Sequence, residues 1–69
     1  MRPKGQAIRA IRSAQNVSIR GLEAATGLNR GYLSRLERGR IREAGEQQVR
    51  RVALALGVTH DAITHKEES

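Results

Sequence analysis

The apolar positions of this chain recur with the period of an α-helix over most of its length. The pattern is clearest between Glu46 and Leu56, where apolar residues at i, i+3, i+4 and i+7 form one stripe: Val49, Val52, Ala53 and Leu56. Glu46 suits the positive end of the helix dipole, and Gly57 can end a helix in a left-handed conformation. These features predict a helix from Glu46 to Leu56.

A first helix is predicted from Gly5 to Gln15. Its apolar stripe consists of Ala7, Ile8, Ile11 and Ala14. Asn16 follows where a helix favours a left-handed residue, and Asn tolerates that conformation. No helix is expected before Pro3. Residues 1–4 therefore form a basic arm, which is either a frayed end or an arm that lies on a phosphate backbone.

Between Ser18 and Gly39, two short helical patterns are joined by a tight turn. Ser18 is a natural N-cap for a helix that runs to about Thr26. Gly27 can end this helix and reverse the chain, because glycine adopts left-handed conformations readily. Asn29 is the next N-cap and precedes the second pattern closely.

The second helix of this pair is predicted from about Arg30 to Arg38, with Leu33 and Leu36 pointing inward. Its outward positions are Arg30, Gly31, Ser34 and Arg35. Two short helices joined by a tight turn, the second with a basic outer face, indicate a helix-turn-helix. An ordinary helical hairpin with a charged surface is the alternative.

A last short helix is predicted from His60 to about Thr64, capped by Thr59, with Ile63 pointing inward. The sequence thus predicts an all-α fold, a compact five-helix domain over residues 5–64, with a polar, disordered tail at residues 65–69. A domain of this size buries only about 60% of its unfolded surface.

The net charge of +6 is concentrated in the N-terminal part of the chain. Residues 1–42 carry ten Lys or Arg and two Glu, a balance of +8, whereas residues 43–69 have a balance of −2. A localised basic face indicates a polyanionic partner. A membrane surface would require a basic amphipathic helix with aromatic anchors, and the chain has no Trp or Phe. We therefore expect a cytoplasmic, nucleoid-associated protein without a membrane partner.

The helix-turn-helix and the charge together predict sequence-specific binding of double-stranded DNA by a repressor-like transcriptional regulator. Arg30 and Arg35 are the main candidates for base readout, because arginine can donate two hydrogen bonds to guanine. Ser34 is a weaker candidate. Backbone candidates lie at the starts of both helices and in the loop that follows them: Ser18, Ile19, Arg20, Asn29, Arg38, Arg40 and Arg42. Tyr32 is either a packing residue or a further phosphate contact.

Several segments resemble the lambda-repressor-like helix-turn-helix domains of the Xre/Cro type. They are I-R-A-I-R with Val17 and Ser18, L-x-x-x-x-G-L at 22–28, Y-L-S-R-L-E-R-G at 32–39 and V-A-L-A-L-G-V-T at 52–59. The resemblance covers roughly residues 7–64. It implies a five-helix fold whose third helix lies in the major groove, and phosphate contacts from the ends of helices two and three and from the following loop.

The resemblance also implies an ion pair between Arg12 and Glu37, a role for Arg12 that periodicity alone does not supply. The chain departs from the family in three places. Glu23 stands where the family has a small residue at the crossing of helices two and three, so it must reach solvent or meet an arginine. Asn16 replaces a frequent Gly. Gly31 replaces a side chain that often reads a base, which limits direct readout there.

Catalytic and metal chemistry have little support in the sequence. There is no Cys, which excludes disulfides and thiolate metal sites. His60 and His65 flank Asp61 but lack further ligands. Ser18 and Ser34 lack a neighbouring base in the pattern. We therefore expect a non-enzyme without metal or cofactor.

The expected partner is a double-stranded DNA operator with two half-sites in inverted repeat, bound by a homodimer that is weak without DNA. Val58, Ala62 and Ile63 are the apolar residues expected to form the dimer contact. Two alternatives stay open. One is an antitoxin or operon-controlling DNA-binding protein with a protein partner, and the other is a protein-binding adaptor on the same fold.

Overall fold

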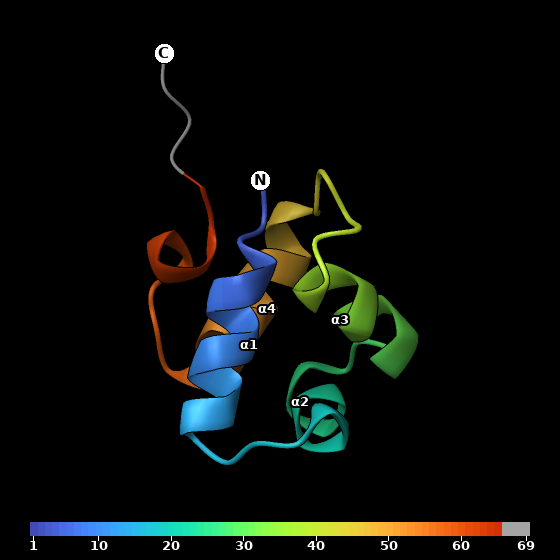
Figure 1. Cartoon of the computed structure of the whole chain (residues 1–69), viewed down its shortest axis with the longest axis vertical. Coiled ribbons are helices and arrows are strands. Elements are labelled where there is room, and N and C mark those ends of the chain that lie inside the picture. The colour runs from blue at the N-terminus through green and yellow to red at the C-terminus, as the bar shows by residue number, and fades with distance from the viewer. Residues whose placement is uncertain (66–69) are drawn as a thin grey trace.

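The computed structural model describes residues 1–65 and places four α-helices and one short 3-10 helix in that range. The elements are α1 (Gly5–Ala14), α2 (Ile19–Thr26), α3 (Arg30–Glu37), α4 (Glu46–Leu56) and the 3-10 helix η1 (His60–Ile63). In Figure 1, α2 and α3 follow α1, and the chain returns through α4. Of the predicted tail, only His65 is described, and residues 66–69 lie outside the described part.

The predicted helix boundaries agree with the structure to within about one residue. Ser18 caps α2, since its Oγ accepts a hydrogen bond from the N–H of Gly21 at 2.9 Å. Asn16 has a left-handed backbone, with φ of 58°, as its place after α1 predicts. Gly27 has φ of 74° and ends α2. Short-range capping chemistry therefore fixes most of the boundaries.

The last of the five predicted helices is present as a 3-10 helix of four residues, so the described residues hold four α-helices and this shorter element. The side chain of Thr59 makes no capping hydrogen bond. The hydroxyl of Thr64 donates to the carbonyl oxygen of His60 at 3.0 Å, and Thr64 itself is extended. A tighter 3-10 turn is common in such short connecting pieces. Here it places Ile63 in the core and lets the chain turn directly toward the N-terminus.

One aliphatic core joins all five elements. It consists of the buried residues Ile8, Leu22, Leu33, Leu36, Ala44, Val49, Val52, Ala53, Leu56 and Ile63. α3 packs against α1 and α2, α2 also packs against α4, and η1 lies against α1 and α4. Burying these side chains contributes about 1.5–3 kcal/mol for each large aliphatic residue. The core thus holds α3 from one side and leaves its other side outward.

The N-terminal arm is fixed to the domain by backbone hydrogen bonds. The N–H of Lys4 donates to the carbonyl oxygen of Ile63 at 2.7 Å, and the N–H of His65 donates to that of Arg2 at 2.9 Å. Pro3 between them is buried, whereas Arg2 and Lys4 are exposed. Figure 1 shows the N-terminal segment beside the segment that follows η1. The backbone of the arm is therefore not frayed.

α1 begins directly against the end of α3. Gly5 is buried there, and a Cβ on it would lie 2.6 Å from the carbonyl oxygen of Glu37 and would also overlap that of Leu36. Both neighbours are backbone atoms, which cannot rotate away as a side chain can. This close approach requires glycine at the first position of α1.

Within the described residues, no helix has the length and apolar character that crossing a membrane requires.

Candidate nucleic-acid interface

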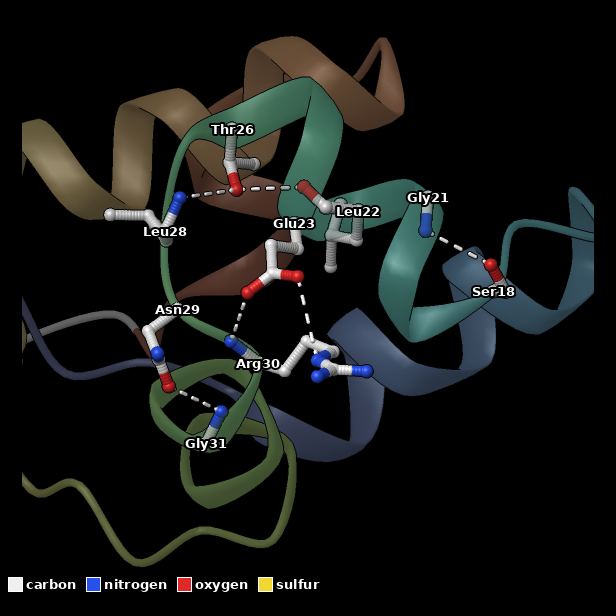
Figure 2. A network of polar contacts seen from close by, with 9 residues as sticks. All are labelled: Ser18, Gly21, Leu22, Glu23, Thr26, Leu28, Asn29, Arg30 and Gly31. Atoms are coloured by element: carbon white, nitrogen blue, oxygen red, sulfur yellow. Dashed lines mark hydrogen bonds and ion pairs between the residues drawn. The ribbon is translucent and has the colours of Figure 1, made fainter.

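The turn between α2 and α3 is held by hydrogen bonds from both of its sides (Figure 2). The N–H of Gly27 donates to the carbonyl oxygen of Glu23 at 2.8 Å. The buried hydroxyl of Thr26 donates to the carbonyl oxygen of Leu22 at 2.7 Å and accepts from the N–H of Leu28 at 3.1 Å. The Thr26 hydroxyl therefore joins the last turn of α2 to Leu28, which lies between α2 and α3. These bonds fix the path of the chain into α3.

The first turn of α3 is capped by two side chains. Asn29 Oδ1 accepts from the N–H of Gly31 at 2.7 Å. Glu23 reaches across from α2, and its Oε2 accepts from the N–H of Arg30 at 2.9 Å. Its Oε1 lies 3.4 Å from Nε of Arg30. Glu23 thus meets an arginine, one of the two outcomes expected from its position.

The crossing of α2 and α3 remains closely packed despite Glu23. Leu22 on α2 and Leu33 on α3 are both fully buried. The carboxylate of Glu23 leaves the crossing toward the start of α3, and the side chain is 37% exposed. A longer side chain is tolerated here because its polar end finds donors outside the core.

The structure brings the four predicted base-reading residues together on the outer side of α3: Arg30, Gly31, Ser34 and Arg35. Ser34 is partly buried and the other three are exposed. Leu33 and Leu36 occupy the opposite side and are fully buried. This face offers two guanidinium groups and one hydroxyl, which are donors of the kind that read base edges.

The start of α2 presents a second part of the surface. Ser18 uses its hydroxyl to cap the N–H of Gly21. The N–H groups of Ile19 and Arg20 lie in the first turn, where an α-helix supplies no partner of its own. Arg20 is exposed, and Ile19 packs against the core. Free N–H groups at a helix start suit an anionic oxygen such as that of a phosphate.

The loop after α3 carries the three predicted phosphate-contacting arginines, Arg38, Arg40 and Arg42, and all three are exposed. The N–H of Arg40 donates to the carbonyl oxygen of Arg35 at 2.9 Å, which holds the loop against the end of α3. Within residues 1–65, none of the three forms an ion pair. Their charge is therefore available to a partner.

Arg12 of α1 and Glu37 of α3 form a two-point ion pair. Arg12 Nε lies 2.6 Å from Glu37 Oε2, and its Nη2 donates to Oε1 at 3.0 Å. The Arg12 and Glu37 side chains are only 16% and 7% exposed. Hydrogen bonding to Glu37 raises the pKa of Arg12 above its ordinary value, against the opposing effect of burial. Arg12 Nη1 also donates to the carbonyl oxygen of Val17 at 2.9 Å, so this one side chain ties α3 to the segment that leads into α2.

A basic groove with a volume of about 730 Å³ runs from α3 to the N-terminal arm. Ser34 and Ile19 are among its lining residues. Six Lys or Arg residues line it as well: Arg2, Lys4, Arg9, Arg12, Arg38 and Arg42. Glu37 is the one acidic residue among its described lining, and Arg12 neutralises it. The basic surface therefore extends beyond the helix pair to α1 and the arm.

The helix-turn-helix family model matches residues 8–63. The chain belongs to the helix-turn-helix family. The match covers α2, the turn and α3, together with the helices that hold them, as the lambda-repressor-like resemblance in the sequence implies. A comparison with curated protein sequences gave no match.

Several solved helix-turn-helix structures are similar to this one. The restriction-modification controller protein C.AhdI from Aeromonas hydrophila is 31% identical over 84% of this chain and 86% of its own, with a TM-score of 0.78. The clp gene regulator ClgR from Corynebacterium glutamicum is 39% identical over 81% of this chain and 71% of its own, with a TM-score of 0.73. SinR, a master regulator for biofilm formation solved in complex with DNA, is 28% identical over 81% and 89%, with a TM-score of 0.77.

Some features of this helix-turn-helix surface were missed by the sequence interpretation. Arg9 is exposed on α1, and no local signal places it in the same groove as Arg38, which follows α3. The expected contact between Glu23 and an arginine did not specify Arg30, because the partner depends on how α2 crosses α3. Tyr32, by contrast, packs against the core, which is one of the two roles expected from the sequence, and its partial burial raises the pKa of its hydroxyl.

The expected dimer contact needs a correction at one residue. Ile63 is fully buried inside the domain, whereas Ala62 is exposed and Val58 is partly buried. Leu54 on α4, which the sequence analysis did not single out, is 82% exposed. It falls between the inward positions Val52, Ala53 and Leu56, so its helical position alone indicates an outward side chain.

No group of three or more His, Cys, Asp or Glu that could hold a metal ion occurs in the range 1–65. His60 Nε2 instead lies 3.4 Å from Oδ1 of the neighbouring Asp61.

Proposed function

We propose that this helix-turn-helix protein is a repressor-like transcriptional regulator that binds double-stranded DNA sequence-specifically, with α3 in the major groove. The observation that carries the proposal is the outer face of α3, where Arg30, Ser34 and Arg35 lie together above a buried aliphatic side. An α-helix fits the width of the major groove, and arginine can donate two hydrogen bonds to guanine there.

The surroundings of α3 support backbone contacts on both of its sides. The start of α2 offers N–H groups, and the loop after α3 offers Arg38, Arg40 and Arg42. Such contacts set the position of a protein on the duplex, and base contacts then supply sequence preference. The similarity to SinR, which was solved with DNA, agrees with this arrangement.

The basic groove extends the proposed backbone contact toward Arg9, Lys4 and Arg2. Its described lining holds no unneutralised carboxylate, so it is compatible with a phosphate strand that passes from α3 toward the arm. Each phosphate neutralised by Lys or Arg releases counterions and steepens the dependence of affinity on salt.

Selection of bound duplexes from a random pool tests this function directly. We expect one enriched motif, and an affinity for it that falls steeply as salt rises. Enrichment of no motif, together with no salt-dependent binding to random duplex, would instead favour the protein-binding adaptor.

We further propose a homodimer on an inverted repeat. One copy presents one recognition helix, and two copies related by a two-fold axis place their helices about one helical turn apart on DNA. Such a contact would use three apolar residues of the late segment: the exposed Leu54 and Ala62 and the partly buried Val58.

An operon-controlling protein is the second candidate. C.AhdI controls a restriction-modification system, and its similarity spans 84% of this chain and 86% of its own. Under this proposal the selected motif would occur beside the gene for this protein. A motif absent from that region would favour control of other genes.

A further inference from the structure

One carboxylate on α2 holds both the backbone and the side chain of the first residue of α3. Glu23 Oε2 accepts from the N–H of Arg30 at 2.9 Å, and Glu23 Oε1 lies 3.4 Å from Arg30 Nε. Figure 2 shows the carboxylate between the two groups. The Arg30 side chain remains 49% exposed, so it is held but not buried.

The geometry leaves the outer edge of the Arg30 guanidinium available. The group has five N–H donors, and the Glu23 carboxylate pairs with it from the Nε side at 3.4 Å. The two terminal nitrogens form a separate edge, and no other acceptor within residues 1–65 is bonded to them. Guanine presents two acceptors on its major-groove edge, which an arginine can meet with two donors at once. The same guanidinium can therefore be held by Glu23 on one edge and bind guanine with the other.

Fixing a long side chain before binding changes what the contact costs. A free arginine loses rotamer freedom when it docks, and preorganisation removes part of that loss. The carboxylate also offsets the charge of Arg30, which weakens its attraction for any phosphate that comes near. Both effects favour a directional contact with a base over a diffuse contact with the backbone.

We propose that Glu23 is a positioning residue that sets Arg30 for guanine recognition and thereby determines the base preference at the position Arg30 reads. This inference rests on the proposed function, because it requires the start of α3 to lie in the major groove. Glu23 itself touches no base under this proposal and acts through Arg30.

A purely structural role for Glu23 as a cap of α3 makes a different prediction. Asn29 already caps the same turn through Gly31. A cap alone would affect the stability of α3 and the affinity for all sequences alike. A positioning residue would affect discrimination at one base pair and leave discrimination at the other positions unchanged.

The test uses the selected duplex and its three alternatives at each contacted base pair. Arg30→Ala identifies the base pair that Arg30 reads, with an expected loss of discrimination of about five- to 150-fold. Glu23→Ala is expected to lower discrimination at that same base pair by at least about threefold, and not at the base pair read by Arg35. In the double variant, the loss should not exceed that of Arg30→Ala alone, since Glu23 acts through Arg30.

Two further variants separate charge and folding from positioning. Glu46→Ala removes a carboxylate that pairs with the exposed Arg50, so it controls for the general gain in affinity when an acid is lost. Glu23→Gln keeps an acceptor for the Arg30 N–H but loses the charge, and it should lose part of the discrimination while α3 remains capped. If Glu23→Ala fails to fold, the discrimination measured with Glu23→Gln tests whether Glu23 positions Arg30.

The outcomes distinguish failure of this inference from failure of the proposed function. Full discrimination in Glu23→Gln and Glu23→Ala, with a loss in Arg30→Ala, would leave Glu23 as a cap only and overturn the inference. Unchanged discrimination in Arg30→Ala and also in Arg35→Ala would overturn the readout by α3 itself.

Discussion

The exposed arginines on and after α3 differ in the kind of DNA contact that their positions favour. Arg35 lies on the outer face of α3, whereas Arg40 lies in the loop beyond it, and both are exposed. Sequence alone distinguishes these positions, because helical spacing puts Arg35 opposite the buried Leu33 and Leu36. It cannot distinguish how much each contributes, since both side chains carry the same donors.

Replacing Arg35 with Ala should therefore cost about 1–3 kcal/mol on the selected duplex and relax the preference at one base pair. Replacing Arg40 with Ala should weaken binding to all sequences alike and reduce the salt slope by about one. Binding titrations at several salt concentrations, on the selected duplex and its base-pair variants, measure both effects. An Arg35→Ala protein with unchanged sequence preference would remove Arg35 from the readout.

The ion pair between Arg12 and Glu37 is expected to contribute to the stability of the folded domain rather than to DNA contact. Replacing Glu37 with Gln leaves the largely buried Arg12 charged without its carboxylate, and breaking such a pair typically costs about 3–5 kcal/mol. Total stability of about 5 kcal/mol is the low end of the usual range, so the variant should be close to unfolded.

Thermal unfolding followed by circular dichroism measures this loss. Glu46→Gln is the matched control, because its pair with Arg50 is exposed and should change stability by less than about 0.5 kcal/mol. Equal melting temperatures for Glu37→Gln and the unchanged protein would show that the pair contributes little.

At the scale of elements, the sequence predicted what depends on neighbours along the chain. The caps at Ser18 and Asn29 and the left-handed Asn16 are local, and each is present in the structure. Contacts between different helices could not be predicted from the sequence in this way. Arg9 and Arg38 line one groove because of the angle at which α1 and α3 pack, which periodicity does not encode.

The glycine at the start of α1 gives a test of such packing. Gly5→Ala would place a Cβ against the carbonyl groups of Leu36 and Glu37, and overpacking of this kind typically costs about 1–3 kcal/mol. The strain should also shift the end of α3. Chemical denaturation measures the stability, and Gln6→Ala is the control because Gln6 is the exposed next residue of the same helix. A Gly5→Ala protein as stable as the control would mean that α1 and α3 separate at no cost.

At the scale of the whole molecule, the proposed homodimer is expected to form through the exposed apolar residues late in the chain. Leu54 is a large apolar residue that is 82% exposed on α4, away from the core-facing side of that helix. If two copies meet there on DNA, Leu54→Glu should place a charge in the contact of each copy. We expect loss of cooperative binding to the inverted repeat and unchanged binding to an isolated half-site.

Sedimentation of the free protein and titration of full-site and half-site duplexes measure this prediction. We expect mostly monomer at low micromolar concentration without DNA. Ala10→Glu adds the same charge at an exposed position of α1 and serves as the control. Full cooperativity in Leu54→Glu would move the dimer contact elsewhere.

The pairing of the arm with the segment after η1 has a consequence for hydrogen exchange. Amides near chain ends usually exchange fast, because ends open locally at little cost in free energy. Here the amides of Lys4 and His65 donate to the carbonyl oxygens of Ile63 and Arg2, beside the buried Pro3. Releasing either segment breaks both bonds, so these two amides should exchange together and as slowly as amides in α1. Exchange measured by NMR would show fast, unequal rates for the pair if the two segments opened independently.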